Sequence, residues 1–358
     1  MNTITPQNYH NRSAKIEIDY IALLDNFKII RAQTHSLIYA VVKANSYGHG
    51  SIKCVLTLNE YADGFAVATI DEASSIKPYV NGLPILIFQG FSCKNELKLC
   101  IKNNFIPVVY SYKQLIILST AKLAAKPKIF IKFNSGMGRL GFDAKDIDDI
   151  KLIIDGKFDY GIMSHLCCAD DKKSTKTTEQ IKNFKKICAN FNSNIQKSLA
   201  NSAGIFSQQE SHFDIVRPGV SLYGISPFNV ANQPKLKPVM SFKAKIMAVY
   251  ERNKNQSIGY GATYICHKKT TIAVINAGYA DGYPRVLNDK TYCFINGKKN
   301  LIVGRVSMDS ICIKVDTGDV KVGDDVVLWG KEIAIEDVAR SAGTIGYELS
   351  CRAGGLLA

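Results

Sequence analysis

The sequence predicts an α/β fold in which an N-terminal (β/α)8 barrel of the TIM type is followed by a C-terminal, mostly antiparallel β domain. The first observation is that short apolar runs alternate with amphipathic segments through residues 37–217. The second is a change after Pro227, where apolar and polar residues alternate and Gly, Asn and Asp turns join the segments. Continuous apolar strands between helices indicate a parallel sheet covered on both faces, whereas alternation is typical of antiparallel sheets.

Eight apolar runs are expected to form the barrel strands. They are Leu37–Lys43, Phe65–Ala68, Pro84–Phe88, Ile106–Tyr110, Lys128–Phe133, Tyr160–His165, Lys197–Asn201 and Phe213–Arg217. Helical spacing is found between most of them, as in Asp143–Ile154 and Thr177–Phe191, and a helix over about Tyr20–Ala32 precedes the first. A doubly wound sheet is the alternative, but it usually has fewer strands and a Gly-rich first turn, which this chain lacks.

The β domain is predicted from five segments with alternating residues. They are Ser241–Tyr250, Thr270–Ile275, Tyr292–Ile295, Ser310–Val315 and Asp325–Leu328. Residues 227–238 contain three prolines and show little periodicity, which is typical of a linker. We therefore expect a barrel domain at residues 1–230 and a β domain at residues 231–358.

Composition excludes several classes of protein. The net charge is +14, but the lysines are spread along the chain with no basic run among aromatics, so we expect no nucleic-acid partner. No apolar run approaches the roughly 20 residues that span a membrane, and residues 1–13 lack the apolar core of a signal peptide. The ten cysteines are scattered without a CxxC pair, which favours reduced thiols in a cytoplasm. We expect no metal site.

Polar residues follow the predicted strands at their carboxyl ends, where the active sites of such barrels form. They are Lys43, Lys132, Arg139, His165, Asn201, Ser202 and Arg217. Each has an ordinary alternative: His165 as a buried, hydrogen-bonded histidine, Ser202 as a helix cap and Arg217 as a surface residue. Their convergence on one rim favours a functional site.

This rim also predicts a cofactor. Lys43 ends an apolar strand and faces a Gly-rich turn, where a partly desolvated amine can condense with a carbonyl group. Ser202 and Gly219 follow the last two predicted strands, where barrels commonly bind phosphate. A cofactor with an aldehyde at one end and a phosphate at the other fits this arrangement, and pyridoxal phosphate (PLP) meets that description.

Seven motifs then resemble those of the alanine racemase family, in the family's order. They are AVVKANSYGHG at 40–50, FNSGMGRLGF at 133–142, LANSAG at 199–204, VRPGVSLYG at 216–224, SIGYGATY at 257–264, NAGYADGYPR at 276–285 and VGRVSMDS at 303–310. The resemblance implies a PLP-dependent enzyme that interconverts L-alanine and D-alanine and supplies D-alanine for peptidoglycan. It also implies a two-base mechanism, with Lys43 holding PLP and acting as one base. Tyr260 is then the second base, supplied by the partner subunit of a homodimer.

The same resemblance assigns supporting roles. Arg217 faces the pyridine nitrogen, His165 links Arg217 to Tyr260, and Arg139 contacts the cofactor and the substrate carboxylate. Tyr47, Ser202, Gly219 and Val220 hold the phosphate, while Met308 and Tyr279 line the substrate site. Lys132 matches a family lysine that is often carbamylated, with an unmodified lysine as the alternative.

The chain departs from the family at its end, where the Arg-Val-Pro-like tail and a phosphate-binding tyrosine do not follow residues 346–349. Weaker PLP binding is therefore expected. Three alternatives are a PLP decarboxylase of related architecture, a racemase of broader specificity and a non-catalytic PLP-binding protein. The decarboxylase motifs are not visible, and a non-catalytic binder has no β domain. The narrow site expected from Tyr279 and Tyr264 favours alanine.

Overall fold

A computed structural model describes residues 14–121, 127–228, 234–288, 290–316 and 319–357. The chain divides into two compact units, Tyr20–Lys237 and a second unit formed by Met1–Asp19 with Pro238–Ala358. The domain boundary expected between residues 230 and 231 lies outside the described residues. Residues 1–13, in which we expect no signal peptide, lie outside them as well. Each unit has its own sheet and hydrophobic core.

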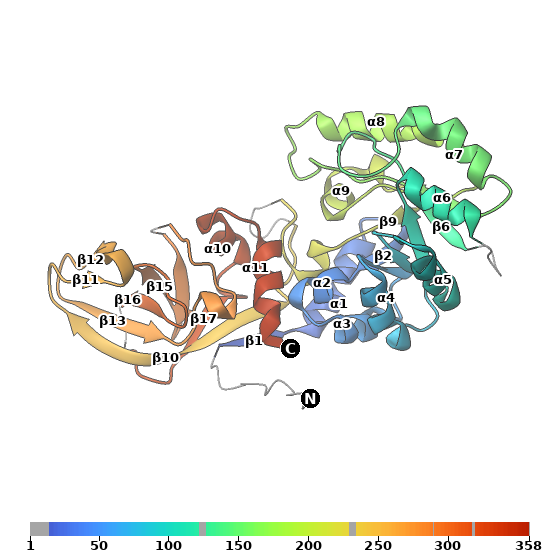
Figure 1. Ribbon diagram of the computed structural model, residues 1–358. Helices are drawn as coiled ribbons and strands as arrows, with labels where there is room; N and C mark the ends of the chain where they lie inside the picture. The colour runs from blue at the N-terminus through green and yellow to red at the C-terminus, as the bar shows by residue number, and fades with distance from the viewer. Residues whose placement is uncertain (1–13, 122–126, 229–233, 289, 317–318, 358) are drawn as a thin grey trace. The chain divides into compact units, whose positions relative to one another are not determined.

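The first unit is the expected barrel (Figure 1). Its parallel strands pair in chain order and the last returns to the first, which closes the sheet. They are β2 Leu37–Val41, β3 Gly64–Val67, β4 Ile85–Ile87, β5 Ile106–Val109, β6 Lys128–Lys132, β7 Asp159–Met163, β8 Lys197–Ser198 and β9 Ile215–Val216. The predicted (β/α)8 barrel is therefore confirmed.

Helices pack against the outside of the strands, because each helix buries an apolar stripe against the sheet. The α-helices of this unit are α1 Tyr20–Arg31, α2 Lys43–Gly48, α3 Ser51–Leu58, α4 Ile70–Ile76, α5 Lys94–Asn103, α6 Tyr112–Thr120, α7 Ile147–Ile154, α8 Lys176–Cys188 and α9 Ser202–Ser207. Within α2, residues 44–47 have left-handed backbone angles. Short 3-10 turns are η1 Lys77–Tyr79, η2 Ala144–Asp146, η3 Gln209–Ser211 and η4 Val220–Tyr223. Side-chain caps start three of the helices, at Thr69, Ser111 and Asn201.

The barrel has two layers of core. One buried cluster comes only from the strands and includes Tyr39, Val108 and Phe130, which fill the interior. A larger cluster joins strands to the surrounding helices through residues such as Ile131 and Phe184. This rigid scaffold carries the loops at the carboxyl ends of the strands.

The second unit contains an antiparallel sheet in the order β1-β10-β13-β16-β15-β14-β17, with a further pairing between β10 and β17. Its strands are β1 Lys15–Ile18, β10 Met240–Arg252, β13 Thr270–Ile275, β14 Tyr292–Ile295, β15 Lys298–Val303, β16 Ile311–Val315 and β17 Asp325–Trp329. The remaining elements are the hairpin of β11 Ser257–Ile258 with β12 Tyr264–Ile265, the helices α10 Ile335–Ser341 and α11 Gly346–Ala353, and the turns η5 Tyr260–Ala262, η6 Tyr279–Asp281 and η7 Gly354–Leu357. The expected β domain is confirmed, with two helices in addition.

Most expected elements differ from the observed ones by a few residues at their ends, and two of these differences show a local change of backbone. The first barrel strand ends at Val41 and not at Lys43, because residues 44–47 turn in the left-handed region. The helix expected over Asp143–Ile154 begins with a 3-10 turn before α7.

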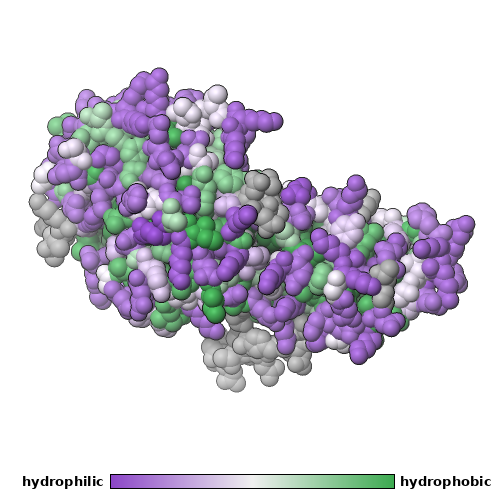
Figure 2. All heavy atoms as spheres, turned by 180° about the vertical axis from the view of Figure 1, so that it is seen from behind, coloured by the Kyte–Doolittle hydropathy of each residue, from purple (hydrophilic) through white to green (hydrophobic). Residues whose placement is uncertain are grey.

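On the face drawn in Figure 2, hydrophilic residues are spread over the surface with smaller hydrophobic areas between them. Within the described ranges, no helix is both long and apolar enough to cross a membrane.

Candidate active site

The carboxyl ends of the barrel strands gather the residues that the sequence singled out there. Lys43 follows β2, Lys132 is the last residue of β6, His165 follows β7, Ser202 follows β8 and Arg217 follows β9. Because all eight strands are parallel, these ends lie on the same rim of the barrel. The predicted convergence of these side chains is thus built into the topology.

Lys43 is followed by an unusual backbone turn. Four successive residues without glycine, Ala44 to Tyr47, have φ between 51° and 56°. L-residues avoid this left-handed region, so the turn needs support from its surroundings. Glu72 Oε1 accepts a hydrogen bond from the Ala44 amide at 2.8 Å, and Asn45 Oδ1 accepts one from the Ser51 amide at 2.8 Å. The turn presents Lys43, whose Nζ lies 5.8 Å from the centre of the Phe88 ring, and Tyr47.

Arg217 is a buried cation, with 3% of its surface exposed. Its guanidinium donates hydrogen bonds to Ser198 Oγ, to the Ser164 carbonyl at 2.7 Å and to the Leu199 carbonyl at 3.3 Å. All of these acceptors are neutral, and burial lowers the pKa of Arg217 to about 10. The positive charge is therefore held in place without being cancelled by these partners.

His165 lies beside this guanidinium, with its Nδ1 3.5 Å from an Arg217 nitrogen. Because a guanidinium can only donate, Nδ1 is the acceptor and the ring carries its proton on Nε2. Burial and the Arg217 charge hold the pKa of His165 well below its ordinary value. His165 is thus a neutral donor through Nε2 at neutral pH.

A third basic group, Lys132, completes a positive cluster. Burial, assisted by the nearby Arg217 and Arg139, lowers the pKa of Lys132 to about 8, and Lys43 acts in the same direction. Arg139 lies on an exposed loop whose amides at Gly136 and Gly138 donate to Asn134 Oδ1. In the described part of the chain, no carboxylate contributes to the pKa shifts of Lys132 and His165. Four cations around one neutral histidine favour an anionic ligand.

The expected phosphate site is compact and rich in donors. Ser202 Oγ accepts hydrogen bonds from the Gly219 amide at 2.9 Å and from the Ser221 hydroxyl at 3.0 Å. A Cβ on Gly219 would lie only 2.5 Å from the Tyr47 hydroxyl oxygen, so a larger residue here would displace the Tyr47 side chain. Val220 is buried and begins η4 directly after it. Backbone and hydroxyl groups can therefore approach an anion closely here.

Three predicted residues belong to the C-terminal unit. Tyr260 is 68% exposed and is flanked by Gly259 and Gly261, which both adopt positive φ values near 72°. Tyr279 and Met308 lie on two loops joined by backbone hydrogen bonds, from the Tyr279 amide to Ser307 and from the Ala280 amide to Met308, each 3.1 Å long. This unit thus presents a phenol on its surface and, separately, two loops tied together by backbone hydrogen bonds.

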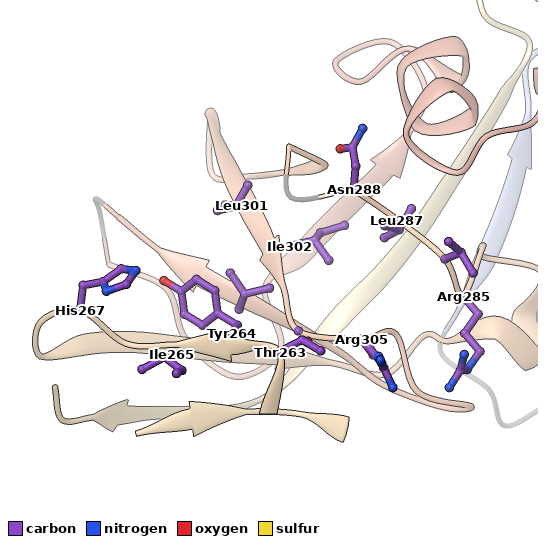
Figure 3. Close-up of a pocket in the computed structure, with 13 residues that line it drawn as sticks. Thr263, Tyr264, Ile265, His267, Arg285, Leu287, Asn288, Leu301, Ile302 and Arg305 are labelled. Atoms are coloured by element: carbon purple, nitrogen blue, oxygen red, sulfur yellow. The ribbon is translucent and has the colours of Figure 1, made fainter. Parts of the chain in front are cut away.

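The C-terminal unit also contains a pocket of about 800 Å³ (Figure 3). Arg285 and Arg305 lie at one end of it, and His267 lies at the other. Tyr264, which the sequence reasoning expected to narrow the substrate site, lines its wall. The two arginines were not singled out from the sequence, although both occur within family motifs. A guanidinium pair is suited to attract a carboxylate.

Glu72 and Ser198 are two further residues that the sequence reasoning missed. Glu72 closes a capping box with Thr69 at the start of α4, and its spacing of three residues from Thr69 is a readable signal for that role. Its second contact, to the Ala44 amide, joins the first turn of α4 to the left-handed turn after Lys43 and has no local signal in the sequence. Ser198 is recognisable only once the barrel brings β8 beside β9.

Comparison with known proteins matches both units. Residues 18–227 match the family model "Alanine racemase, N-terminal domain", and residues 239–357 match "Alanine racemase, C-terminal domain". An alanine racemase of Legionella pneumophila (strain Lens) is 38% identical over 354 residues, which covers 96% of this chain and 98% of that protein. The alanine racemase of Pasteurella multocida (strain Pm70) is 38% identical over 347 residues, which covers 94% and 95%.

Solved structures give the same result. The biosynthetic alanine racemase of Pseudomonas aeruginosa superposes with a TM-score of 0.92 at 33% identity, covering 96% of this chain and 97% of that one. The alanine racemase of Bartonella henselae, solved with covalently bound pyridoxal phosphate, superposes with a TM-score of 0.87 at 31% identity, covering 95% and 97%. The similarity therefore extends over both units and nearly the whole length of the chain.

Proposed function

This chain belongs to the alanine racemase family, and we propose that it interconverts L-alanine and D-alanine with PLP as its cofactor. The observation that supports this most is the group of basic side chains at the barrel rim, Lys43, Lys132 and Arg217, around the neutral His165. Such a site fits a ligand that carries a phosphate and a carboxylate. The proposed physiological role is the supply of D-alanine for peptidoglycan.

The residues at the rim fit PLP. The Lys43 amine would carry the cofactor covalently, and Tyr47, Ser202, Gly219 and Val220 would hold its phosphate. Glycine at position 219 leaves room for the Tyr47 hydroxyl beside this proposed phosphate site. Arg217, which keeps its proton, would face the pyridine nitrogen. When bound, PLP supplies an electron sink that acidifies the Cα–H of an amino acid.

Racemisation requires that a proton leave one face of Cα and that another arrive on the opposite face. We assign Lys43 and Tyr260 to these two faces. Arg217 donates to His165 Nδ1, so His165 keeps a proton on Nε2. In the proposed homodimer this proton would be donated to the phenolic oxygen of Tyr260 from the partner subunit. Arg139 and the backbone at Met308 would orient the substrate carboxylate, and Tyr279 would limit the size of the side chain. These roles leave each proton transfer to a residue of this protein.

The proposed active form is a homodimer in which Tyr260 enters the barrel of the partner subunit. Tyr260 is 68% exposed, and Met308 and Val286 of the same unit are 52% and 68% exposed. Tyrosine and methionine are enriched in surfaces that a second chain covers.

Two further features belong to the proposal. With a pKa of about 8, Lys132 has enough neutral amine to react with carbon dioxide, and the resulting carbamate would place an anion beside Arg139. The proposed location is the cytoplasm, where the ten cysteines, none of which forms a disulfide among the described residues, would stay reduced.

The Tyr260→Phe variant tests the two-base assignment. It removes one hydroxyl from an exposed ring, so the fold and PLP binding should be unchanged. We expect it to lose exchange of the Cα proton when the reaction starts from L-alanine. The matched control is Tyr292→Phe, which alters another exposed tyrosine of the same unit and should keep exchange. Robust exchange from L-alanine in the Tyr260→Phe protein would refute the role of Tyr260.

A further inference from the structure

Two adjacent cysteines, Cys167 and Cys168, lie on the loop after β7 and begin two residues beyond His165. Their sulfur atoms are 3.4 Å apart, and both side chains are partly exposed. No other two cysteines are adjacent in the sequence. In the described residues, no group of three or more metal-binding side chains exists, so the pair is not part of a metal cluster. The catalytic proposal leaves both thiols unused.

The surroundings of the pair suit oxidation to a disulfide. Redox-sensitive cysteines have a low pKa, are solvent-accessible and often stand next to a second thiol that resolves the first oxidation product. The pair meets the conditions of exposure and of a neighbouring thiol. Burial and the hydrogen bond with Cys168 raise the pKa of Cys167, while the Lys176 cation opposes that shift. The first attack on an oxidant is therefore slow at Cys167. The second step is fast, because a thiol 3.4 Å away acts at a very high effective concentration.

The loop is coupled to His165 through Gln180 of α8, which is completely buried. Gln180 Oε1 accepts from the Cys167 amide at 2.9 Å, and its Nε2 donates to the His165 carbonyl at 2.9 Å. One rigid side chain thus fixes the backbone of a cysteine and of the active-site histidine together. A movement at Cys167 either breaks a buried hydrogen bond or shifts the amide group that positions His165.

We propose that Cys167 and Cys168 are an oxidation site at the rim of the active site, where a peroxide converts them to a disulfide that slows turnover. One thiol loses its proton, and the resulting thiolate attacks a peroxide oxygen and breaks the O–O bond. This gives a sulfenic acid and a hydroxide or alkoxide, which takes up the proton and leaves as water or an alcohol. The second thiol attacks the sulfenic sulfur, forms the S–S bond and releases water. The two thiols lose two electrons and the peroxide gains them.

The disulfide must be strained. Adjacent Cα atoms are about 3.8 Å apart, whereas disulfides usually join Cα atoms separated by about 4.4–6.8 Å. The backbone at Cys167 must therefore move, and strained disulfides are readily reduced. The site would respond reversibly in a reducing compartment. The effect on turnover rests on the proposed racemase function, whereas the formation of the disulfide does not.

The formation of the disulfide is tested by mass spectrometry on the reduced, PLP-loaded protein after treatment with hydrogen peroxide and alkylation of the remaining thiols. The tryptic peptide of residues 158–172 contains both cysteines and no others. We expect this peptide to lose two hydrogens, to escape alkylation and to recover both thiols with dithiothreitol. Sulfinic acid at either cysteine, or two alkylated thiols after treatment, would overturn the proposal.

The coupling to His165 is tested by turnover of the same samples. We expect a loss on the order of tenfold in kcat that dithiothreitol restores, since small displacements at active sites have effects of this size. Cys168→Ser should keep the original turnover and lose the sensitivity, while Cys93→Ser, at an exposed single cysteine, should retain it. Equal sensitivity of the Cys168→Ser and unaltered proteins would overturn the coupling.

If the untreated protein does not racemise alanine, the proposed function fails by itself. Backbone hydrogen exchange at residues 165–169 then decides the coupling: faster exchange after oxidation supports it and unchanged exchange overturns it.

Discussion

The left-handed turn after Lys43 predicts that a glycine at position 44 stabilises the barrel. Ala44 has φ 51° and ψ 53°, and its side chain is exposed, so the Ala44→Gly change removes no buried contact. The left-handed region costs an L-residue about 1–2 kcal/mol, because its Cβ approaches a carbonyl oxygen. Glycine avoids this cost.

Glycine also loses more backbone freedom on folding, by about 0.5–1 kcal/mol relative to alanine. The difference between the two effects leaves a net stabilisation of about 0.5–1 kcal/mol. Ala189, an exposed alanine at the end of α8, has φ −63° and ψ −16°. Ala189 is in the right-handed region, so glycine removes no left-handed strain at this position. Ala189→Gly should therefore destabilise the same unit by about 0.5 kcal/mol.

Hydrogen exchange on peptides from the barrel strands measures how each variant changes the free energy of unfolding of the barrel unit. Ala44→Gly should slow the exchange of globally protected amides about two- to fivefold, and Ala189→Gly should accelerate it. If both variants accelerate exchange to a similar degree, the turn costs alanine nothing and the reasoning is refuted.

Three further changes test the rim. Because the pKa of Lys132 is lowered in the folded protein to about 8, the unfolded chain binds the extra proton between about pH 8 and 10.5. In buffer free of carbon dioxide, Lys132→Met should therefore be more stable than the unaltered protein at pH 7. In urea unfolding, the difference in unfolding free energy between the two proteins should shrink as the pH rises through that window. Glu72→Ala removes the acceptor of the Ala44 amide and should lower the free energy of unfolding by about 1–3 kcal/mol, with loss of activity; an unchanged unfolding midpoint would contradict its role. Gly219→Ala places a Cβ 2.5 Å from the Tyr47 hydroxyl and should weaken PLP retention in equilibrium dialysis by tenfold or more, whereas tight retention would remove Gly219 from the phosphate site.

The barrel was predictable because its strands are local apolar runs. Even so, the expected strand end at Lys43 was two residues too long. The residues Ala44 to Tyr47 carry no signal for a left-handed turn, and contacts from distant Glu72 stabilise it. Such a conformation depends on tertiary context, which single-residue preferences do not contain.

The β unit shows the same limit. Strand β1 was missed because its partner, β10, lies more than 200 residues away, with Lys15 opposite Lys243. Strand β15 begins with polar residues, Lys298 to Asn300, and so lacks a clear apolar pattern. The rim residues Lys43, His165 and Arg217 were found because polar side chains at the ends of apolar strands are unusual. Ser198 accepts a hydrogen bond from Arg217, and Gln180 donates one to the His165 carbonyl. These two supporting residues could be recognised only from the folded structure.

The most direct test of the proposed function uses purified, PLP-loaded protein with L-alanine in deuterated water. Optical rotation and the Cα proton signal are followed together, with carbon dioxide release as a third readout. A racemase reduces the optical rotation to zero while deuterium enters at Cα, and it releases no carbon dioxide. Retained optical activity with no exchange at Cα, or release of carbon dioxide, would contradict the assignment.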